Sequence, residues 1–379
     1  MKKNRLLELD ALRGIAALAV VVYHYFYRYN ELHNRPDDIL NWVYFGKYGA
    51  QFFFIISGFV IYWTLSRVDK PLDFLISRFS RLYPVYWVAV IITFSIVAIT
   101  GLPGKEVSIY EALCNLLMFH EYFKIPHVDG VYWTLTVELT FYFWIFILYL
   151  SRQLKWAEYW MLPVLMVAVL QSTGFFKLPE IVNKIFITYH ISFFIAGISF
   201  YKIINKTSDR FTIPLILISL VSTAFIISFK HFLVFSFFYT GFYLAISGRL
   251  RFLSFKPFVF LGGISYSLYL IHQNVGFVIL NKFSENQLPT APGAFLSIVL
   301  CVIAASLLNR YVEKPALSAI REFYRSNRRM KQIADMFAFN RQNVSSVLVS
   351  DKQTHGKIGR TQELSSSSAG QEQSKSDSE

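Results

Sequence analysis

Long apolar runs, broken by short polar segments, set the pattern along the chain. Ten of these runs come close to the roughly 20 residues that a helix needs to cross a bilayer. They cover residues 9–29, 48–67, 84–101, 130–150, 157–173, 184–201, 212–229, 232–248, 257–280 and 292–312. The pattern predicts an all-α, polytopic membrane protein with about ten transmembrane helices. The seventh and eighth runs are the least well separated, because Phe229-Lys230-His231-Phe232 leaves almost no room for a turn.

Lysine and arginine gather in every second connection between these runs. The basic segments are residues 2–5, 67–81, 152–155, 202–210, 249–256 and the stretch that begins at Lys314. Cytoplasmic loops carry an excess of these residues, so the distribution predicts that both termini are cytoplasmic. Arg13 and the bulky residues after it argue against a cleaved signal peptide, and we expect an uncleaved first span. The predicted location is the inner (plasma) membrane, with many crossings.

Composition agrees with this class and removes others. The chain is 54% hydrophobic and 16% charged, whereas soluble domains average about 25% charged residues. In a soluble protein the net charge of +13 would indicate a nucleic-acid partner. Here most of the basic residues lie in short loops between the apolar runs, so membrane topology accounts for them and no nucleic-acid partner is expected. Cys114 and Cys301 form neither a CxxC motif nor a zinc pattern. We therefore predict no metal site and no disulfide framework.

The chain divides at about residue 315. Residues 1–315 form the predicted transmembrane domain, and residues 316–379 form a cytoplasmic tail. The first part of the tail, 321–329, is basic and is expected to lie on the anionic inner leaflet of the bilayer. From about Ser345 the tail is rich in Ser, Gln, Lys and Glu, a composition typical of disorder.

Three polar groups interrupt the first apolar run, namely Asp10, Arg13 and His24. Arg13 and His24 are eleven residues apart, which is about 20° past three helical turns and a rise of roughly 16 Å. Asp10 lies on the same side, within about 40° of His24. Polar groups in hydrocarbon are costly and usually face a bundle interior or a wet cavity. The spacing therefore predicts one polar stripe along the first helix.

Titratable groups on other runs reach a similar depth. Glu138 is the only carboxylate in the middle of a run, and His272 and His190 reach the same layer by residue count. A histidine beside a carboxylate is the usual general base, so we predict that Glu138 orients His24. The alternative for His24 is a hydrogen-bonded packing residue, and for His272 it is a hydrogen bond between helices.

Two further motifs stand out, one in a basic segment near the cytoplasm and one within the second apolar run. Arg78 and Arg81 follow each other at a helical spacing and fit either a membrane anchor or a fork for a pyrophosphate. Ser57-Gly58 breaks a bulky run, which fits either close helix packing or a passing ligand. The chain contains no P-loop, no Rossmann glycine pattern and no GxSxG elbow.

Together these motifs resemble the acyltransferase 3 family of integral membrane acyltransferases. The resemblance covers about residues 5–315 and is carried, in order, by LDALRG (9–14) with His24, GAQFFFIISG (49–58), RFSRLYP (78–84), WTLTVE (133–138) and SYSLYLIH (265–272). It implies an O-acyltransferase that uses acyl-CoA, commonly acetyl-CoA, as donor substrate and needs no bound cofactor. The implied acceptor is a hydroxyl of a carbohydrate, such as a surface polysaccharide or its lipid-linked precursor.

The resemblance also implies roles for single residues. His24 and Arg13 match the family's essential pair, and Glu138 matches its acidic position. Arg78 and Arg81 match its cytoplasmic basic motif. We thus expect His24 to act as general base, Glu138 to orient or charge-balance it, and Arg78 and Arg81 to bind donor phosphates. The residues Asp10, Ser57, Trp133, Tyr269 and His272 are expected to support the site.

Some alternatives stay open at this point. Arg13 either neutralises a phosphate or pairs with Asp10. Transfer is either direct or passes through an acyl-enzyme on His24 or Ser57. Two other classes of protein also compete. The first is a proton-coupled transporter or lipid-linked sugar flippase, because buried charges often line the paths of such proteins. The second is a sensor or scaffold that acts through the basic tail.

Overall fold

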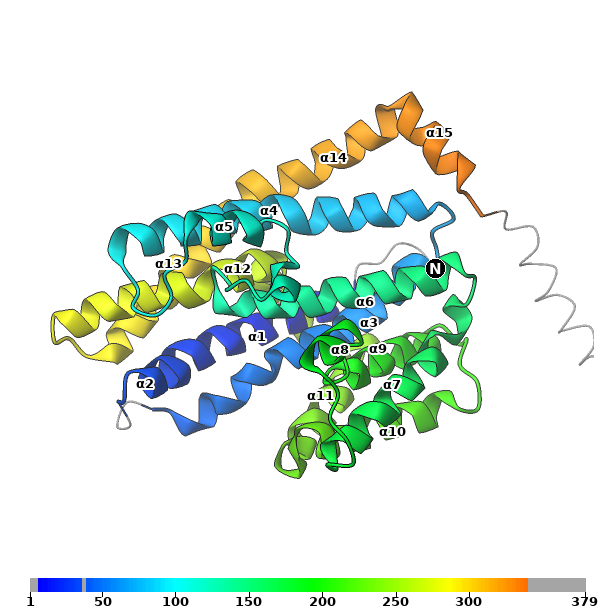
Figure 1. Ribbon diagram of the computed structural model, residues 1–379, viewed down its shortest axis with the longest axis horizontal. Coiled ribbons are helices and arrows are strands. Elements are labelled where there is room, and N and C mark those ends of the chain that lie inside the picture. Colours follow the sequence, from blue (N-terminus) through cyan, green and yellow to red (C-terminus); the bar gives the residue numbers. More distant parts are fainter. Residues whose placement is uncertain (1–5, 36–38, 340–379) are drawn as a thin grey trace, which may run out of the picture.

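The computed structural model describes residues 6–35 and 39–339, and within these ranges the chain is helical, without a β-strand. The α-helices are α1 (Leu7–Tyr23), α2 (Tyr29–Leu32), α3 (Gly49–Leu65), α4 (Pro71–Thr100), α5 (Ile109–Asn115), α6 (Trp133–Leu150), α7 (Ala157–Ser172), α8 (Glu180–Ile185), α9 (Ile191–Ile204), α10 (Thr212–Thr223), α11 (Phe229–Ile246), α12 (Lys256–Glu285), α13 (Thr290–Leu308), α14 (Lys314–Ser326) and α15 (Arg328–Met336). Most of the long helices run side by side as one bundle (Figure 1).

Short irregular turns extend several of these helices. Three are π-helical, namely η1 (His24–Arg28), η7 (Ala224–Ser228) and η9 (Asn309–Glu313). The others are the 3₁₀ segments η3 (Asn41–Tyr48), η4 (His120–Phe123), η5 (Gly130–Tyr132), η6 (Leu154–Trp156) and η8 (Arg251–Ser254). The π-helical turns η1 and η9 carry residues of the polar network described below.

The predicted class is confirmed. Each of the ten apolar runs contains a helix, and six helical segments of the described chain are long and apolar enough to cross a membrane. They are Leu7–Leu32, Asn41–Leu65, Pro71–Thr100, Gly130–Leu150, Thr212–Ile246 and Thr290–Ser326. Ten spans and cytoplasmic termini remain predictions.

The poorly separated seventh and eighth runs form a helical hairpin. Ser228 has extended backbone angles, φ 177° and ψ 147°, and caps α11 through its side chain. The two helices then lie against each other, with the hydroxyls of Ser219 and Tyr239 3.4 Å apart. One extended residue is enough for this turn, which explains why the sequence shows almost no connection there.

Glycines let α1 and α12 touch along their length. A Cβ atom added to Gly262 would lie 1.9 Å from the carbonyl oxygen of Asp10, and one added to Gly14 would lie 2.5 Å from the Gly262 nitrogen. At the other end, the Tyr25 ring packs on Gly276 and its hydroxyl donates to the His272 carbonyl at 2.6 Å. Small residues allow such close contact between helices in a membrane.

A second glycine contact joins α3 to α9. A Cβ atom on Gly197 would lie 2.2 Å from the Ile55 carbonyl oxygen, and one on Gly58 would lie 2.5 Å from the Phe194 carbonyl oxygen. Gly58 therefore serves helix packing. Its neighbour Ser57 points to another side of α3, where a cavity opens.

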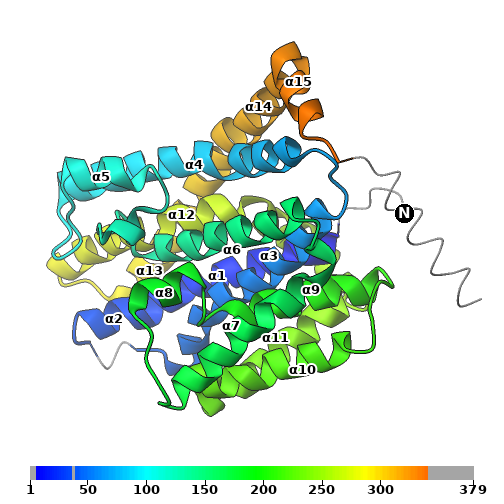
Figure 2. The same ribbon diagram turned by 45° about the vertical axis from the view of Figure 1, so that its right-hand side comes forward.

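The last two helices leave the bundle and lie along α4. Figure 2 shows α14 rising beside the beginning of α4, with α15 turning back toward the start of α4. Tyr324 donates to Asp73 at 2.5 Å, and Lys70 pairs with Asp335. The tail thus begins as structure that packs on the bundle. The part of the tail predicted to be disordered lies outside the described residues.

The contact between α1 and α12 can be tested with neighbouring glycines. Gly262→Ala places a methyl group against the Asp10 backbone, whereas nothing lies within 4 Å of a Cβ on Gly263. Overpacking of this kind costs about 1–3 kcal/mol, so we expect Gly262→Ala to lower the melting temperature of the purified protein. Gly263→Ala is the matched control and should not lower it. Equal melting temperatures for the two variants would contradict this packing.

Candidate functional site

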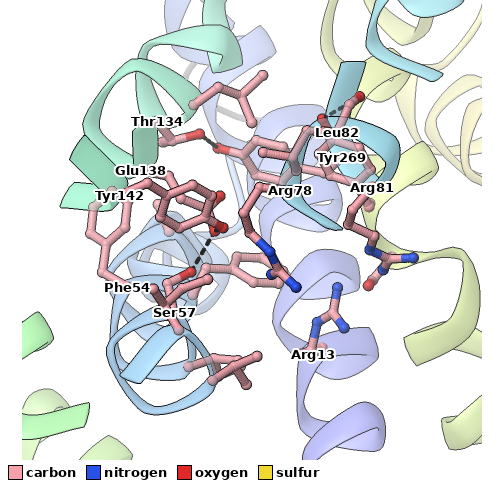
Figure 3. A pocket seen from close by; sticks show the side chains of 18 of the residues that line it. Arg13, Phe54, Ser57, Arg78, Arg81, Leu82, Thr134, Glu138, Tyr142 and Tyr269 are labelled. Carbon is pink, nitrogen blue, oxygen red and sulfur yellow. Dashed lines mark hydrogen bonds between the residues drawn. The ribbon is translucent and has the colours of Figure 1, made fainter. Parts of the chain in front are cut away.

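A cavity of about 340 Å³ lies among six helices, α1, α3, α4, α6, α12 and α14. Its charged lining residues are Arg13, Arg78, Arg81, Glu138 and Arg321. Figure 3 shows Arg13, Arg78 and Arg81 on one side of the cavity, with Glu138, Ser57 and Tyr142 on the other. Four arginines and one carboxylate thus line the cavity, and an excess of positive charge attracts anions.

Arg81 is held in place by a buried carboxylate. It forms an ion pair with Glu313 of η9, whose side chain is only 1% exposed. Glu313 also accepts hydrogen bonds from Ser267 at 2.8 Å and from Asn309 at 3.0 Å. The π-helical turn that carries Glu313 thus fixes the position of Arg81 at the cavity wall.

Arg13 is placed so that either of the two roles that the sequence left open is possible. Its guanidinium lies 3.9 Å from the Asp10 carboxylate, at the limit of an ion pair, and it also lines the cavity. A contact this loose leaves the guanidinium donors of Arg13 available to a second anion.

Arg78 and Arg321 approach the same hydroxyl group. The Nη2 atom of Arg78 lies 3.2 Å from Ser77 Oγ, and the Nη2 atom of Arg321 lies 3.3 Å from the same oxygen. The Arg78 Nε atom is buried and has no hydrogen-bond partner within the described chain. Buried polar groups usually have partners, so this nitrogen is a candidate donor to a bound ligand.

Glu138 is engaged by hydroxyl groups. Ser57 donates to its Oε1 atom at 2.6 Å, and Tyr142, one helical turn further along α6, donates to the same oxygen. The carboxylate faces the arginine cavity and fixes the Ser57 hydroxyl. This arrangement makes Ser57 a polar group of the cavity wall.

His24 is paired with His272, so the prediction that Glu138 orients the His24 ring directly is wrong, while the charge-balancing role of Glu138 stays a prediction. The His24 Nδ1 atom lies 3.2 Å from His272 Nε2 and 2.8 Å from the Val20 carbonyl oxygen. Glu138 instead accepts hydrogen bonds from Ser57 and Tyr142, on the cavity side of α6. Counting residues gives the depth of a side chain but not the direction in which it points, and that direction separates Glu138 from His24.

Hydrogen bonding assigns the tautomer of both rings. His272 Nδ1 lies 2.9 Å from the Tyr269 carbonyl oxygen, which can only accept, so this nitrogen carries a proton and Nε2 has a lone pair. His24 Nδ1 contacts the Val20 carbonyl and must also carry a proton. The proton on His24 is thus shared with His272, and His24 Nε2 is left with a free lone pair.

Tyr269 connects this histidine pair to the cavity. Its ring centroid lies 5.6 Å from that of His272, and its side chain lines the cavity. Its hydroxyl is hydrogen-bonded to Thr134 at 3.0 Å. His24 also begins the π-helical turn η1, and such turns are frequent at functional sites.

Trp133 lies at a second, smaller cavity. Trp133, which was predicted to support the site, packs on His190 with ring centroids 5.3 Å apart. It also helps to line a cavity of about 160 Å³ together with Tyr122, Lys184 and Glu121. Phe54 touches Trp133 and also lines the arginine cavity. Trp133 and His190 therefore stand behind the main site, separated from it by Phe54.

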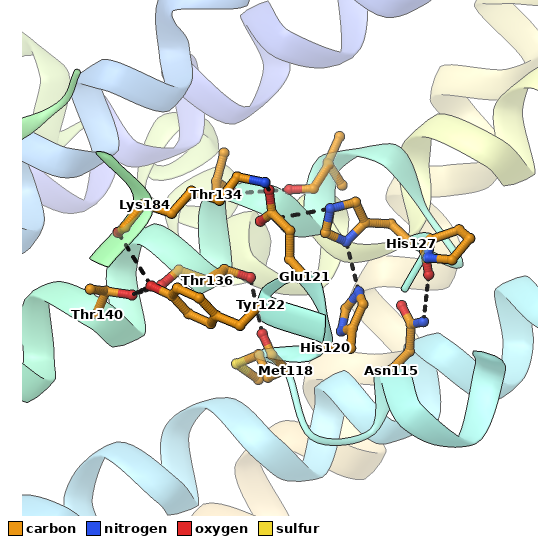
Figure 4. Close-up of polar contacts among 12 residues, drawn as sticks. Asn115, Met118, His120, Glu121, Tyr122, His127, Thr134, Thr136, Thr140 and Lys184 are labelled. Carbon is orange, nitrogen blue, oxygen red and sulfur yellow. Dashed lines mark hydrogen bonds and ion pairs between the residues drawn. The ribbon is translucent and has the colours of Figure 1, made fainter. Parts of the chain in front are cut away.

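The loop before α6 is fastened by a polar cluster, shown in Figure 4. His120 and His127 are hydrogen-bonded at 2.7 Å, and Glu121 pairs with Lys184 at 3.0 Å. Asp129 accepts from the Asn274 backbone at 3.0 Å, which ties the loop to α12. Burial raises the pKa of Asp129 to about 7.

Sequence reasoning missed Arg321, Glu313 and Tyr142. Arg321 lies in the segment expected on the lipid surface. The signal for Glu313 is a lone acid beside the basic segment that starts at Lys314. Tyr142 stands four residues after Glu138, which places the two side chains on one helix face.

The chain is similar to known acyltransferases over most of its length. The family described as "Acyltransferase domain" matches residues 6–310. Peptidoglycan O-acetyltransferase OatA of Listeria monocytogenes is 23% identical over 374 residues, which cover 81% of this chain and 55% of that protein. Acyltransferase MdmB of Streptomyces mycarofaciens is 30% identical over 148 residues, which cover 36% of this chain and 38% of that protein.

A third relative is the exopolysaccharide production protein ExoZ of Rhizobium meliloti, 31% identical over 106 residues, which cover 26% of this chain and 32% of that protein. The chain thus spans between about a third and about half of these curated relatives. No solved structure matches it.

The histidine pair in the loop predicts a pH dependence of stability. Burial, with His127 as a further cause, lowers the pKa of His120 from 6.5 to about 4. Between these values the unfolded chain binds a proton that the folded chain does not, so stability falls as the pH drops. We expect the wild type to lose on the order of 2 kcal/mol more than His120→Asn across this window.

Melting temperatures measured between about pH 7.5 and pH 4.5 test this slope. The test uses the difference in melting temperature between the two proteins and asks how this difference changes with pH. A loss of stability in the variant that is the same at every pH therefore does not affect the result. A difference that stays constant across the range would show that His120 does not titrate in this way.

Proposed function

The chain belongs to the acyltransferase family described above, and on that premise we propose that it moves an acyl group from acyl-CoA to a carbohydrate hydroxyl. The arginine cavity carries this proposal. Four guanidinium groups at one site suit a donor with several phosphate groups. The names of two relatives, a peptidoglycan O-acetyltransferase and an exopolysaccharide production protein, favour an acetyl group and a polysaccharide, or its lipid-linked precursor. We place the protein in the inner (plasma) membrane.

The donor would bind with its phosphates on the arginines. Arg78 and Arg321 are the least neutralised, while Arg81 keeps its pair with Glu313. The acyl-pantetheine arm would then run past Tyr269 toward His24. The rise of roughly 16 Å between Arg13 and His24 along α1 is comparable with the length of that arm.

His24 would act as the general base. Its free Nε2 lone pair takes the proton of the acceptor hydroxyl while the hydroxyl oxygen attacks the thioester carbon. The carbon–sulfur bond breaks, and CoA leaves as a thiolate that then takes up a proton. His272 keeps the His24 ring in the tautomer that this step requires, so we describe it as a positioning residue.

A covalent route has one structural argument in its favour. The Ser57 hydroxyl donates to the Glu138 carboxylate at 2.6 Å inside the cavity, as a nucleophile does to its base. In that route Ser57 would carry the acyl group, and His24 would activate the acceptor afterwards. Both routes use His24, and they differ in the need for Ser57.

Removal of the base is the first test. We expect His24→Ala to lower acyl transfer by at least about 100-fold, the usual scale for a general base. His272→Gln should have a smaller effect and should shift the pH profile, because it changes the tautomer partner. The measurement is CoA release and label transfer from labelled acetyl-CoA in membranes, with the exposed His33→Ala as control.

Full acceptor acylation by a well-expressed His24→Ala protein would exclude the proposed mechanism. Loss of activity in Ser57→Ala, together with a trapped acyl-enzyme in His24→Ala, would assign the covalent route instead. Equal activity of Ser57→Ala and the wild type would support direct transfer.

The competing transporter function makes a different prediction. An acyltransferase draws its driving force from the thioester, so a protonophore should leave CoA release unchanged. A transporter would move its substrate without CoA release and would stop when the gradient collapses. The comparison uses the same membranes with and without the protonophore.

A further inference from the structure

The segment 314–339, here called the C-terminal strap, lies beyond the part of the chain that matches the family, residues 6–310. Its helix α14 nevertheless supplies two residues of the arginine cavity, Leu317 and Arg321. One wall of the cavity is therefore built by a segment that the family match does not include.

The strap is fastened to the beginning of α4 and to the end of α6. Tyr324 donates to Asp73 of α4 at 2.5 Å, and Lys70 forms an ion pair with Asp335 of α15. The strap ends with the Phe339 amide donating to the Asp69 carbonyl at 2.9 Å, and the Phe339 ring packs on Tyr149. These contacts fix α14 over the beginning of α4.

Arg321 reaches the cavity at the level of Ser77. Its guanidinium and that of Arg78 converge on the Ser77 hydroxyl at 3.3 and 3.2 Å. In the described chain neither arginine has an ion pair with a carboxylate. Two cations that converge on one neutral hydroxyl repel each other unless an anion lies between them, and paired guanidinium groups match a phosphate.

The arginines form two levels along α4. Arg78 and Arg321 make the outer level, close to Ser77. Arg81 stands three residues further along α4, a rise of roughly 4.5 Å, and we assign it to the inner level with Arg13; Ser57 and Glu138 line the same cavity. CoA has a similar order, since its 3′-phosphate lies on the ribose, and its pyrophosphate joins the nucleoside to the pantetheine arm.

We infer that Arg321 of the C-terminal strap, together with Arg78, binds the 3′-phosphate of the CoA donor and so selects this donor. The inference rests on the proposed acyl-CoA function. It makes the strap a specificity element of the active site. The inner arginines are then left for the pyrophosphate, and the pantetheine arm points toward Ser57, Tyr269 and His24.

The experiment compares CoA with 3′-dephospho-CoA, which lacks only this phosphate. Equilibrium binding of both is measured on the full-length protein in detergent. We expect the wild type to prefer CoA by roughly tenfold, the scale of one charge-assisted hydrogen bond. Arg321→Gln should remove most of this preference by weakening CoA alone, and Arg321→Lys should retain part of it.

The matched control is Arg325→Gln, which removes the same charge from an exposed position one turn along α14. It should keep the wild-type preference. Size-exclusion profiles and melting temperatures of all variants show whether each is folded, and Arg321→Lys keeps the test valid if the glutamine variant is not.

Each other result has a defined meaning. An unchanged preference in Arg321→Gln, no preference in the wild type, or an equal loss for both ligands would overturn the assignment of Arg321 to the 3′-phosphate. A wild-type protein that binds neither ligand and releases no CoA from acetyl-CoA would overturn the proposed function itself.

Discussion

The direct contact between α1 and α12 is the constraint on which the site depends. Gly14 and Gly262 bring the two backbones together at one end, and Tyr25 packs on Gly276 at the other. Between these points His272 is held against His24 at 3.2 Å. Because little hydrophobic force draws helices together within a bilayer, close packing and hydrogen bonds between helices must hold this contact.

Charge is the second organising principle. An arginine in the interior of a membrane protein is costly unless it is paired or solvated. The four cavity arginines differ in how far their charge is neutralised by a partner. Arg81 has a buried partner in Glu313 and serves partly as structure. Arg13 lies 3.9 Å from the Asp10 carboxylate, while Arg78 and Arg321 meet at the Ser77 hydroxyl and form no ion pair with a carboxylate of the described chain. The outer level is thus the part of the cavity that gains most from a bound phosphate.

The histidine pair gives the proposed base a neutral partner. A carboxylate would both orient the ring and stabilise its protonated form, whereas His272 only fixes the tautomer through its own bond to the Tyr269 carbonyl. Glu138, which could have supplied the negative charge, faces the arginines and the Ser57 hydroxyl. In this arrangement the arginine cavity holds the charges, and the proposed catalytic base lies in a less polar setting.

The sequence by itself determined the helices and much of the cavity. Apolar runs predicted a helix at each position because hydropathy is a local property, and helical spacing placed Arg78 and Arg81 on one face because the helix period is constant. The structure places Arg13, Ser57, Glu138 and Tyr269, all singled out from the sequence, in the lining of one cavity. Only the tertiary structure decided the partners: His272 rather than Glu138 for His24, Phe54 between Trp133 and the cavity, and Arg321 inside the site. Residue counts give depth along a helix, but the direction of each side chain depends on how helices far apart in sequence rotate and pack against one another.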